Sequence, residues 1–358
     1  MEKLAIEGGK PVRETLLPYG HQWIDKKDIK EVIKVLKSDW ITQGPEVEQF
    51  ERAVARYCQA KYSVAVSSGT AALYAAYKVA GVCSGWEVIT TPLTFAATAN
   101  AVIHCGGKPV FADVQPETLN IDPEEIKKKI TKRTKVIVPV DFAGHPCDYD
   151  RILKIAKKHK LLVIEDAAHA LPTRYKGKLI GGFGDVTCFS FYANKTITTG
   201  EGGMLCTNDD KIAKRVKVMR LHGIDRDVWD RFKTGASWEY DVVAPGFKYN
   251  MPDIAAAIGI HQLRKAELFR EKRKRVAQRY FEELKDIPGL ILPKIHCDID
   301  EHSWYIFVIL IDQDKTRQKI GRNQFIEEMT KRDIGTSVHY KPLHRMTYYK
   351  ERYGLKPE

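Results

Sequence analysis

The stretch Leu161-Leu162-Val163-Ile164-Glu165-Asp166 is a short apolar run that ends on two carboxylates. A run of apolar and branched residues between polar ones is typical of a strand buried on both faces of a parallel sheet. Similar runs recur through the first two thirds of the chain and alternate with helical patterns, which predicts an α/β architecture with a mostly parallel sheet. The seven predicted strands are residues 63–66, 87–90, 109–112, 135–140, 161–164, 186–191 and 203–207.

Helical patterns lie between these strands. Residues 47–57 carry an apolar stripe at every third or fourth position, and the alanine-rich residues 71–79 follow the first strand. From about Pro252 the pattern changes, so we predict a large domain over residues 1–251, with its seven-stranded sheet sandwiched by helices, and a smaller C-terminal α+β domain over residues 252–358. The elements predicted for the small domain are a long helix that ends at 284, a strand over 304–310, a helix over 323–331 and a strand over 336–340.

The net charge of +12 on 358 residues raises the question of a nucleic-acid partner. Much of the positive charge lies in residues 211–220 and 264–275, where basic side chains interleave with apolar ones. This pattern favours the solvated faces of amphipathic helices, and no helix-turn-helix or other recognition module accompanies the charge. We therefore expect no nucleic-acid partner, and the excess charge could instead attract an anionic substrate.

The seven cysteines are scattered and form no Cys-x-x-Cys pair, so reduced thiols are expected. No cluster of histidines has metal-ligand spacing. His339 and His344 lie five residues apart on either side of a proline, a pattern that suits a loop lining a cleft better than a helix face with two ligands. No apolar run is long enough for a signal peptide or a membrane span. We expect a cytoplasmic protein with no metal site and no membrane partner.

Asp166 is the first candidate site residue. It ends an apolar strand at the carboxyl edge of the predicted sheet, where α/β folds gather their ligands. An acidic side chain there can pair with the ring nitrogen of pyridoxal phosphate and keep that nitrogen protonated. The alternative is that Asp166 caps a helix that begins at Ala167.

Lys195 is the second candidate. It follows the predicted strand 186–191, and a lysine drawn from the surface to a sheet edge has its pKa lowered, as a nucleophile that forms an imine requires. Ser190, five residues earlier, can reach a phosphate group. A lysine in a loop is normally only solvated, so this interpretation depends on its neighbours.

The turn Ser67-Ser68-Gly69-Thr70 supplies such a neighbour, since it lies between the first strand and the alanine-rich helix. Gly69 permits close backbone approach, Thr70 offers a hydroxyl, and the free N–H groups of the first helical turn attract a phosphate. Taken alone, the turn could be a plain N-cap. A carboxylate, a lysine and a phosphate turn are together the parts needed to hold pyridoxal phosphate, which predicts an aminotransferase.

Several segments together resemble the DegT/DnrJ/StrS family, the nucleotide-sugar aminotransferases of the fold type I superfamily, which depend on pyridoxal phosphate. The resemblance runs from about Pro18 to Tyr349 in the family's order and spacing, and it implies the fold type I aminotransferase architecture. The segments that carry it are residues 67–72, 91–100, 163–170, 189–203, 220–223 and 246–259.

The resemblance implies specific roles for the residues of the cofactor site. Lys195 would be the lysine that binds the cofactor covalently and shuttles protons, and Asp166 would bind the pyridine nitrogen. His169 would lie beside the ring and Phe95 would stack on its face. The phosphate would be held by Gly69, Thr70 and Ser190.

The family builds each active site from two subunits of a homodimer, with the segment Gly246-Phe247-Lys248-Tyr249-Asn250 reaching the partner's phosphate and substrate. The commonest pattern has Asn at the position of Lys248 and Arg at that of Asn250, so which of the two contacts the cofactor stays open. This pair resembles the subgroup that acts on UDP-4-keto sugars. The residues that resemble those lining the sugar-nucleotide cleft are Trp40 and Thr42 of one loop and His339 and Tyr340 of a predicted strand.

We therefore predict transfer of an amino group from L-glutamate to the 4-keto group of a nucleotide-linked sugar, with pyridoxamine phosphate as the intermediate form. The sugar is expected to be a UDP-linked 4-keto-6-deoxy hexose or 4-keto pentose, for a cell-surface glycan such as lipopolysaccharide or for a secondary metabolite. One alternative is a sugar 3-dehydratase, but those relatives carry His at the position of Lys195. Another is a pyridoxal-phosphate-binding regulator without turnover. Relatives usually continue beyond the position of Glu358 with another strand and helix, so a truncated chain and an abbreviated small domain are both open.

Overall fold

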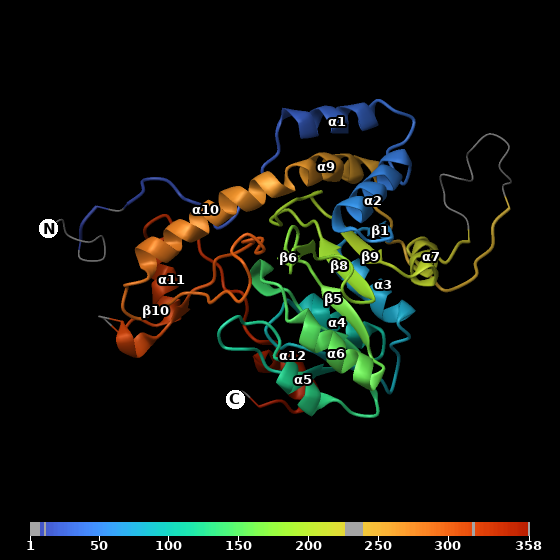
Figure 1. Cartoon of the computed structure of the whole chain (residues 1–358). Coiled ribbons are helices and arrows are strands. Elements are labelled where there is room, and N and C mark those ends of the chain that lie inside the picture. Colours follow the sequence, from blue (N-terminus) through green and yellow to red (C-terminus); the bar gives the residue numbers. More distant parts are fainter. Residues whose placement is uncertain (1–7, 11, 226–238, 317–318, 357–358) are drawn as a thin grey trace.

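A seven-stranded sheet forms the centre of the computed structural model, which describes residues 8–10, 12–225, 239–316 and 319–356 (Figure 1). Five strands in the order β3, β2, β4, β5, β8 run parallel, and β9 lies antiparallel to both of its neighbours, β8 and β1. The sheet is thus mostly parallel, as predicted. The strands are β1 (Tyr62–Val66), β2 (Glu87–Thr90), β3 (Lys108–Phe111), β4 (Thr134–Val138), β5 (Leu162–Asp166), β8 (Val186–Ser190) and β9 (Gly203–Thr207).

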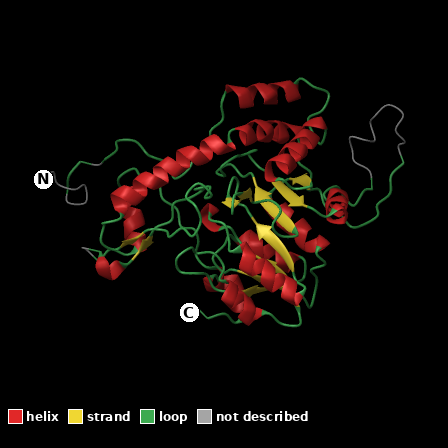
Figure 2. Cartoon of the chain, in the orientation of Figure 1, coloured by secondary structure: helices red, strands yellow, loops and turns green. Residues whose placement is uncertain are grey.

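Helices cover both faces of this sheet, as Figure 2 shows. Successive strand residues point to opposite faces, so Val163 packs into one hydrophobic cluster and Ile164 into the other. The first cluster is closed by α2 (Pro45–Cys58), α5 (Pro123–Lys129), α6 (Tyr149–His159) and α9 (Asp253–Arg264). The second is closed by α3 (Gly69–Val79), α4 (Ala96–His104) and α7 (Asp210–Met219). These two layers confirm the predicted sandwich.

The C-terminal part is built around the long helix α10 (Ala266–Leu284), which follows α9 directly. Helix α9 itself packs on α2 and on α1 (Lys26–Leu36), and Gly259 lies so close to Phe50 that a Cβ would come within 2.5 Å of the ring. The division at Pro252 stays a prediction. Among the described residues, the other strands and α-helices are two short hairpins, β6 (Arg174–Tyr175) with β7 (Lys178–Leu179) and β10 (Leu290–Ile291) with β11 (Leu310–Ile311), and the helices α11 (Arg322–Thr330) and α12 (Thr347–Tyr353).

Both strands predicted for the small domain were wrong, the first in its extent and the second in its existence. Of residues 304–310 only Leu310 lies in a strand, because the carbonyls of Trp304 and Tyr305 accept hydrogen bonds from Arg273 of α10 instead of from a neighbouring strand. Residues 336–340 form no strand either, and the side chains of His339 and Tyr340 contact other parts of the chain. A run of apolar and β-branched residues predicts an extended backbone. It does not predict whether a neighbouring strand is present to form the hydrogen bonds of a β-sheet.

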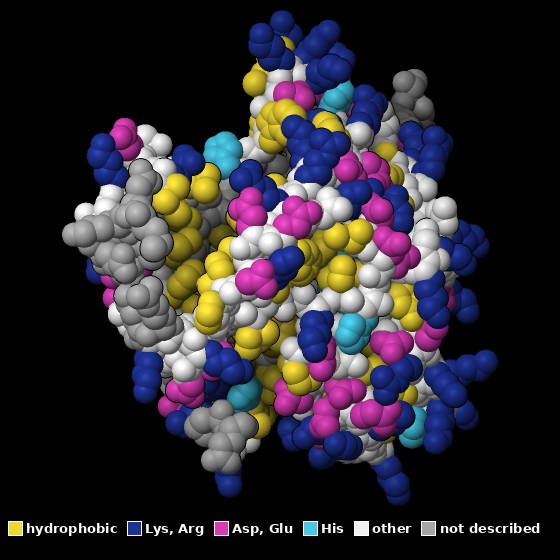
Figure 3. Space-filling model, turned by 60° about the vertical axis from the view of Figure 1, so that its left-hand side comes forward, with side chains coloured by type: hydrophobic (Ala, Val, Ile, Leu, Met, Phe, Trp, Pro, Cys, Tyr) yellow, Lys and Arg dark blue, Asp and Glu magenta, His cyan; other side chains and the backbone are white. Residues whose placement is uncertain are grey.

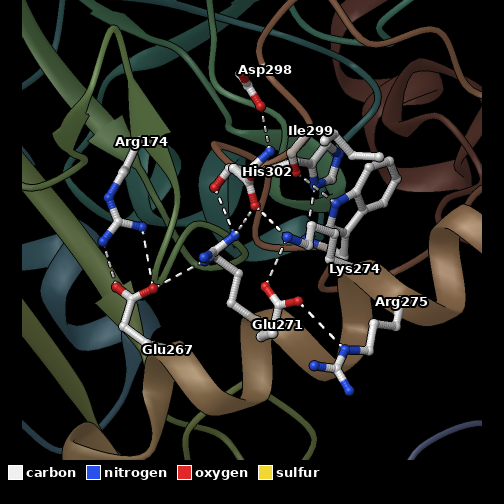
Figure 4. A network of polar contacts seen from close by, with 11 residues as sticks. Arg174, Glu267, Glu271, Lys274, Arg275, Asp298, Ile299 and His302 are labelled. Atoms are coloured by element: carbon white, nitrogen blue, oxygen red, sulfur yellow. Dashed lines mark hydrogen bonds and ion pairs between the residues drawn. The ribbon is translucent and has the colours of Figure 1, made fainter.

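A polar network joins α10 to the rest of the molecule (Figure 4). Glu267 accepts hydrogen bonds from Arg174 of the β6–β7 hairpin at 2.6 Å and from Tyr57 at 2.7 Å. One turn further along the helix, Arg270 donates to the carbonyl of Asp300 at 2.8 Å. The network therefore anchors residues 298–305, the segment that carries Tyr305 toward the carboxyl edge of the sheet.

Charges of both signs are interspersed on the face of the molecule that Figure 3 draws. On the face drawn in Figure 3, Lys and Arg side chains alternate with Asp and Glu and with apolar groups. The two basic stretches form α7 and the first half of α10, which confirms the prediction of amphipathic helices. Within the described ranges, no helix combines the length and apolar character that a membrane crossing would need.

Candidate active site

Asp166 is the last residue of β5 and is only 5% exposed. Its Oδ2 accepts a hydrogen bond from Thr98 at 2.7 Å, and its Oδ1 accepts one from the backbone N–H of Ala168 at 3.2 Å. Burial raises the pKa of this carboxyl group, while Thr98, Ala168 and the charge of Lys195 oppose the rise. No helix begins at Ala167, so Asp166 is not a helix cap.

The neighbouring Glu165 points away from this site, because consecutive strand residues face opposite sides of the sheet. It is fully buried and accepts a hydrogen bond from the backbone of Gly184. Burial raises the pKa of Glu165 to about 8. Of the two carboxylates that end this strand, only Asp166 is therefore available to the site.

Lys195 lies in the turn that follows β8, with its backbone N–H bonded to the carbonyl of Tyr192 at 2.9 Å. Its Nζ is 4.6 Å from the centre of the Tyr305 ring, a favourable position for an ammonium group. Burial lowers the pKa of Lys195 to about 8, and the charge of Asp166 opposes that shift. The unprotonated, nucleophilic fraction of this amine near neutral pH is therefore far larger than that of an ordinary lysine, whose pKa is 10.5.

The phosphate turn begins α3. Ser68 is the N-cap, and its side chain accepts the N–H of Ala71 at 3.1 Å. Gly69 lies directly against Ser190, since a Cβ on Gly69 would come within 2.7 Å of the Ser190 Cβ. The structure thus brings together the three residues predicted to hold a phosphate, and it explains why position 69 has no side chain.

His169 is buried beside Asp166 and has a partner on each ring nitrogen. Its Nδ1 accepts the backbone N–H of Ala143 at 3.3 Å, and its Nε2 lies 3.1 Å from the hydroxyl of Tyr340. The ring packs on Tyr305, with centroids 4.3 Å apart. Burial and then the charge of Lys195 hold the pKa of His169 well below its usual range, so the ring is neutral at physiological pH.

Phe95 is the residue that precedes α4, and the residue is 60% exposed. The nearest described aromatic ring is that of Tyr340, with centroids 6.0 Å apart. An exposed aromatic face beside a buried polar cluster suits stacking on a flat ligand. The structure therefore leaves Phe95 free for its predicted role, which stays a prediction.

The predicted substrate residues lie in less buried surroundings. Thr42 is exposed, and its carbonyl accepts the N–H of Asp253 at 2.8 Å, while the carboxylate of Asp253 accepts the N–H of Gly44 at 2.8 Å. Trp40 precedes this anchored loop and is partly exposed. His339 accepts or donates a hydrogen bond with Tyr19 at 3.2 Å.

Lys248 and Asn250 are side by side, since the Lys248 ammonium donates to the Asn250 side chain. Both lie on a ribbon that pairs with residues 219–222 through backbone hydrogen bonds. The carbonyl of Tyr249 accepts the N–H of Ser67 at 2.7 Å, so the ribbon is also fastened to the phosphate turn of its own chain. The contact of Lys248 and Asn250 with a second subunit stays a prediction.

Three residues near the site were missed from the sequence. Thr98 holds Asp166, Tyr305 packs on both His169 and Lys195, and Asn194 accepts the Tyr305 hydroxyl at 3.2 Å. Thr98 lies in a segment that carried the family resemblance, so its hydroxyl was a usable signal. Tyr305 gave no signal, because it lies in a run that reads as an ordinary strand.

These residues fit pyridoxal phosphate on observations independent of any relative. The buried carboxylate of Asp166, which accepts two hydrogen bonds, suits the protonated ring nitrogen of the cofactor. The half-buried Lys195, with its lowered pKa, suits the carbonyl group of the cofactor. The cradle in which Gly69 meets Ser190, at the start of α3, suits a phosphate.

Comparison with known proteins agrees with this geometry. The model of the DegT/DnrJ/EryC1/StrS aminotransferase family matches residues 22–358. The chain belongs to this family. A curated member, the spore coat polysaccharide biosynthesis protein SpsC of Bacillus subtilis, is 46% identical over 345 residues, which is 96% of this chain and 88% of SpsC.

Solved structures of the DegT/DnrJ/EryC1/StrS family match the fold. PseC of Helicobacter pylori, an aminotransferase of pseudoaminic acid biosynthesis, superposes with a TM-score of 0.88 at 34% identity, over 96% of this chain and 90% of PseC. Spr1654 of Streptococcus pneumoniae, described as a sugar aminotransferase and solved with pyridoxal and with pyridoxamine phosphate, gives 0.85 at 32% identity, over 94% of this chain and, in its pyridoxal form, 88% of Spr1654. The chain is thus a fold type I, pyridoxal-phosphate-dependent sugar aminotransferase.

Proposed function

We propose that this aminotransferase moves the amino group of L-glutamate to the 4-keto group of a UDP-linked sugar, either a 4-keto-6-deoxy hexose or a 4-keto pentose. The product serves a cell-surface glycan or a secondary metabolite. The observation that carries the proposal is the meeting of Lys195, Asp166 and the Gly69–Ser190 cradle at one edge of the sheet. The choice of a UDP sugar rests on the pair Lys248 and Asn250.

The residues of the chain divide the chemistry between them. Bound pyridoxal phosphate supplies a ring that withdraws electrons from the substrate carbon. Asp166 keeps the ring nitrogen protonated, and Gly69, Thr70 and Ser190 hold the phosphate. Lys195 binds the carbonyl group between turnovers and, once released by an amino donor, moves a proton to and from the reacting carbon.

A second copy of the chain completes the site in this proposal. The segment before Lys248 exposes Tyr240, Val242 and Val243, each at least 50% accessible, which suits cover by a partner subunit. Mixing a Lys195→Ala chain with a Lys248→Ala chain tests the arrangement. At nucleotide-sugar concentrations below KM, where the Lys248→Ala chain is impaired, activity of the mixture above the sum of the two separate activities supports shared sites. A mixture whose activity equals that sum contradicts them.

The test of substrate class incubates the protein with glutamate and UDP-, GDP- and dTDP-linked 4-keto sugars and follows amino-sugar formation by mass spectrometry. We expect a UDP sugar to be aminated fastest. The visible absorption of the lysine-bound cofactor should fall with glutamate and return with the correct keto sugar. Failure of every nucleotide sugar together with activity on simple 2-oxo acids would place the enzyme in amino-acid metabolism instead. Retained absorption without turnover would identify a regulator.

A further inference from the structure

The hydrogen bonds of His169 fix which of its nitrogens carries the proton. A backbone N–H can only donate, so the Nδ1 that lies 3.3 Å from the Ala143 N–H must be the unprotonated nitrogen. In the neutral ring Nε2 then carries the hydrogen and donates it to the Tyr340 hydroxyl at 3.1 Å. Tyr340 therefore receives a hydrogen bond, and its own O–H hydrogen is left for another acceptor.

A second tyrosine–histidine pair in the same region has the opposite polarity. Burial and then the charge of Lys195 lower the pKa of His339, and the hydrogen bond to the backbone of Ser337, which opposes that shift, places the ring as the donor. The remaining nitrogen, Nε2, then accepts the hydroxyl hydrogen of Tyr19 at 3.2 Å. The hydroxyl hydrogen of Tyr19 is thus already used, whereas that of Tyr340 is not.

The loop that contains Ala143 is held in place by the buried side chain of Asn120. Asn120 is 2% exposed, and its Oδ1 accepts the N–H of Phe142 at 3.0 Å. Its Nδ2 donates to the carbonyls of His145 and Pro146 at 3.0 and 3.1 Å. Ala143 is thereby locked between two fixed points, and its N–H stays directed at His169.

Tyr340 also has the surroundings of a neutral donor. Its ring lies 6.0 Å from Phe95 and 6.2 Å from Phe142, and burial raises its pKa, so the phenol stays protonated. Among the described donors around His169, Lys195 is assigned to proton transfer at carbon, and the hydroxyl of Tyr305 already donates to Asn194 at 3.2 Å. The oxygen of the ketone therefore still requires a donor, since it gains negative charge when an amine adds to its carbon.

We propose that Tyr340, oriented by the Nε2–H of His169, donates its hydroxyl hydrogen in a hydrogen bond to the carbonyl oxygen of the reacting ketone. The proposal rests on the aminotransferase function. In that step the nitrogen of the attacking amine bonds to the carbonyl carbon, and the π electron pair of the C=O bond moves to the oxygen. The oxygen then leaves as water with two protons that come from the nitrogen. Tyr340 keeps its own proton throughout and stabilises the charge on the oxygen.

The variant Tyr340→Phe keeps the ring and loses only the hydroxyl. Two rates are measured in it, one for proton transfer at the α-carbon and one for the step at the carbonyl oxygen. Exchange of the α-hydrogen of glutamate with deuterium from solvent, followed by NMR, depends on Lys195 and should stay within about threefold of wild type. Release of 2-oxoglutarate is the same step in the reverse direction, since a ketone forms as the amine leaves. Its formation in a single turnover should therefore slow about 10²-fold, as for loss of one oxyanion donor.

Tyr348→Phe, an exposed tyrosine of α12, is the matched control and should change neither rate. Equal slowing of both rates in Tyr340→Phe would mean a general packing role and would overturn the proposal. So would an unchanged rate of 2-oxoglutarate formation. A wild-type protein that forms no 2-oxoglutarate at all would instead contradict the aminotransferase function, so the two failures are distinguishable.

A second measurement needs no turnover. In wild-type protein labelled with ¹⁵N-histidine, the ¹⁵N shifts of His169 should show a protonated Nε2 and an unprotonated Nδ1 at pH 7. The signals can be assigned by their loss in His169→Gln. A His169 with its proton on Nδ1, or with both nitrogens protonated, would remove the basis of the proposal whatever the kinetic result.

Discussion

The floor and the rim of this site are built differently. On the floor, Asp166 ends a central strand, accepts two hydrogen bonds and is almost completely buried. On the rim, Thr42 and Lys248 are exposed side chains of a loop and a ribbon. A central strand in a parallel ladder is hydrogen-bonded to a neighbour on each side, so its end is held firmly, whereas an exposed loop is held by a few bonds. Changes on the floor should therefore affect catalysis, and changes on the rim should affect substrate affinity.

The largest effect is expected for Lys195→Ala. Loss of the amine removes both the nucleophile and the proton carrier, so kcat should fall by at least about 10³-fold. The measurement is 2-oxoglutarate release from glutamate, with Lys129→Ala, an exposed lysine of α5, as the control. Turnover within tenfold of wild type would mean that another residue carries the chemistry.

The same lysine predicts a pH dependence. Its pKa is lowered from 10.5 to about 8 by burial, so the amine gains nucleophilicity as the pH rises through 8. The rate at which the cofactor-free protein captures pyridoxal phosphate should increase up to about pH 8 and then level off. A rate that keeps rising toward pH 10.5 would mean an exposed, ordinary lysine.

Asp166→Asn should produce the next largest loss, about 10²-fold in kcat, because the carboxylate that supports the ring nitrogen disappears while the shape is kept. Because asparagine keeps the shape of aspartate, misfolding should not account for the lost activity. Circular dichroism can verify that the variant is folded. Glu165→Gln, on the opposite face of the same strand, is the internal comparison. If the two variants lost equal activity, the division between the faces would be wrong.

Thr98→Val removes one of the two donors to Asp166 and should lower kcat/KM about tenfold, the size expected for a hydrogen bond to a charged group. The Thr98 bond lowers the pKa of Asp166, so its loss raises that pKa. Activity that requires the ionised carboxylate is then lost at a higher pH on the acidic side. A pH profile of kcat/KM checks this sign, and an acidic limb that moves downward would contradict it.

Lys248→Gln probes the rim and should act mainly on affinity. We expect the KM of the nucleotide sugar to rise about threefold to tenfold, with kcat nearly constant, because a screened surface charge guides and holds an anion. The effect should be larger at low salt. A fall in kcat with no change in KM would move Lys248 from the rim to the floor.

The smallest effect is expected for Glu267→Gln, which lies away from the chemistry in the network of Figure 4. Burial alone would raise the pKa of Glu267, but Arg174, Tyr57 and Arg270 lower it from 4.5 to about 2. A lowered pKa contributes stability above pH 4.5 that is lost as the pH falls toward 2. Since this carboxylate is partly exposed, we expect a cost below about 1 kcal/mol at pH 7, vanishing in acid. Urea unfolding at both pH values measures it, with Glu283→Gln as control.

The same contrast separates the strands that a local pattern predicts from those that it does not. The seven strands of the central sheet were predicted closely, because each is a short, largely apolar run between turns and most of them are buried on both faces. Residues 304–310 carry an equally apolar run, yet only the end of it pairs, since Arg273 takes the carbonyls at its start. The pattern is the same in both places, and the difference lies in what surrounds it.

The sequence by itself determined the sheet, the position of Asp166 at a strand end and the glycine of the turn before α3, because these depend on local pattern and on sterics along a few residues. Only the tertiary structure decided that Thr98 supports Asp166, that Tyr305 lies under Lys195 and that Ala143 selects the tautomer of His169. These contacts join residues far apart in the chain. Their geometry is set by packing, which no local pattern encodes.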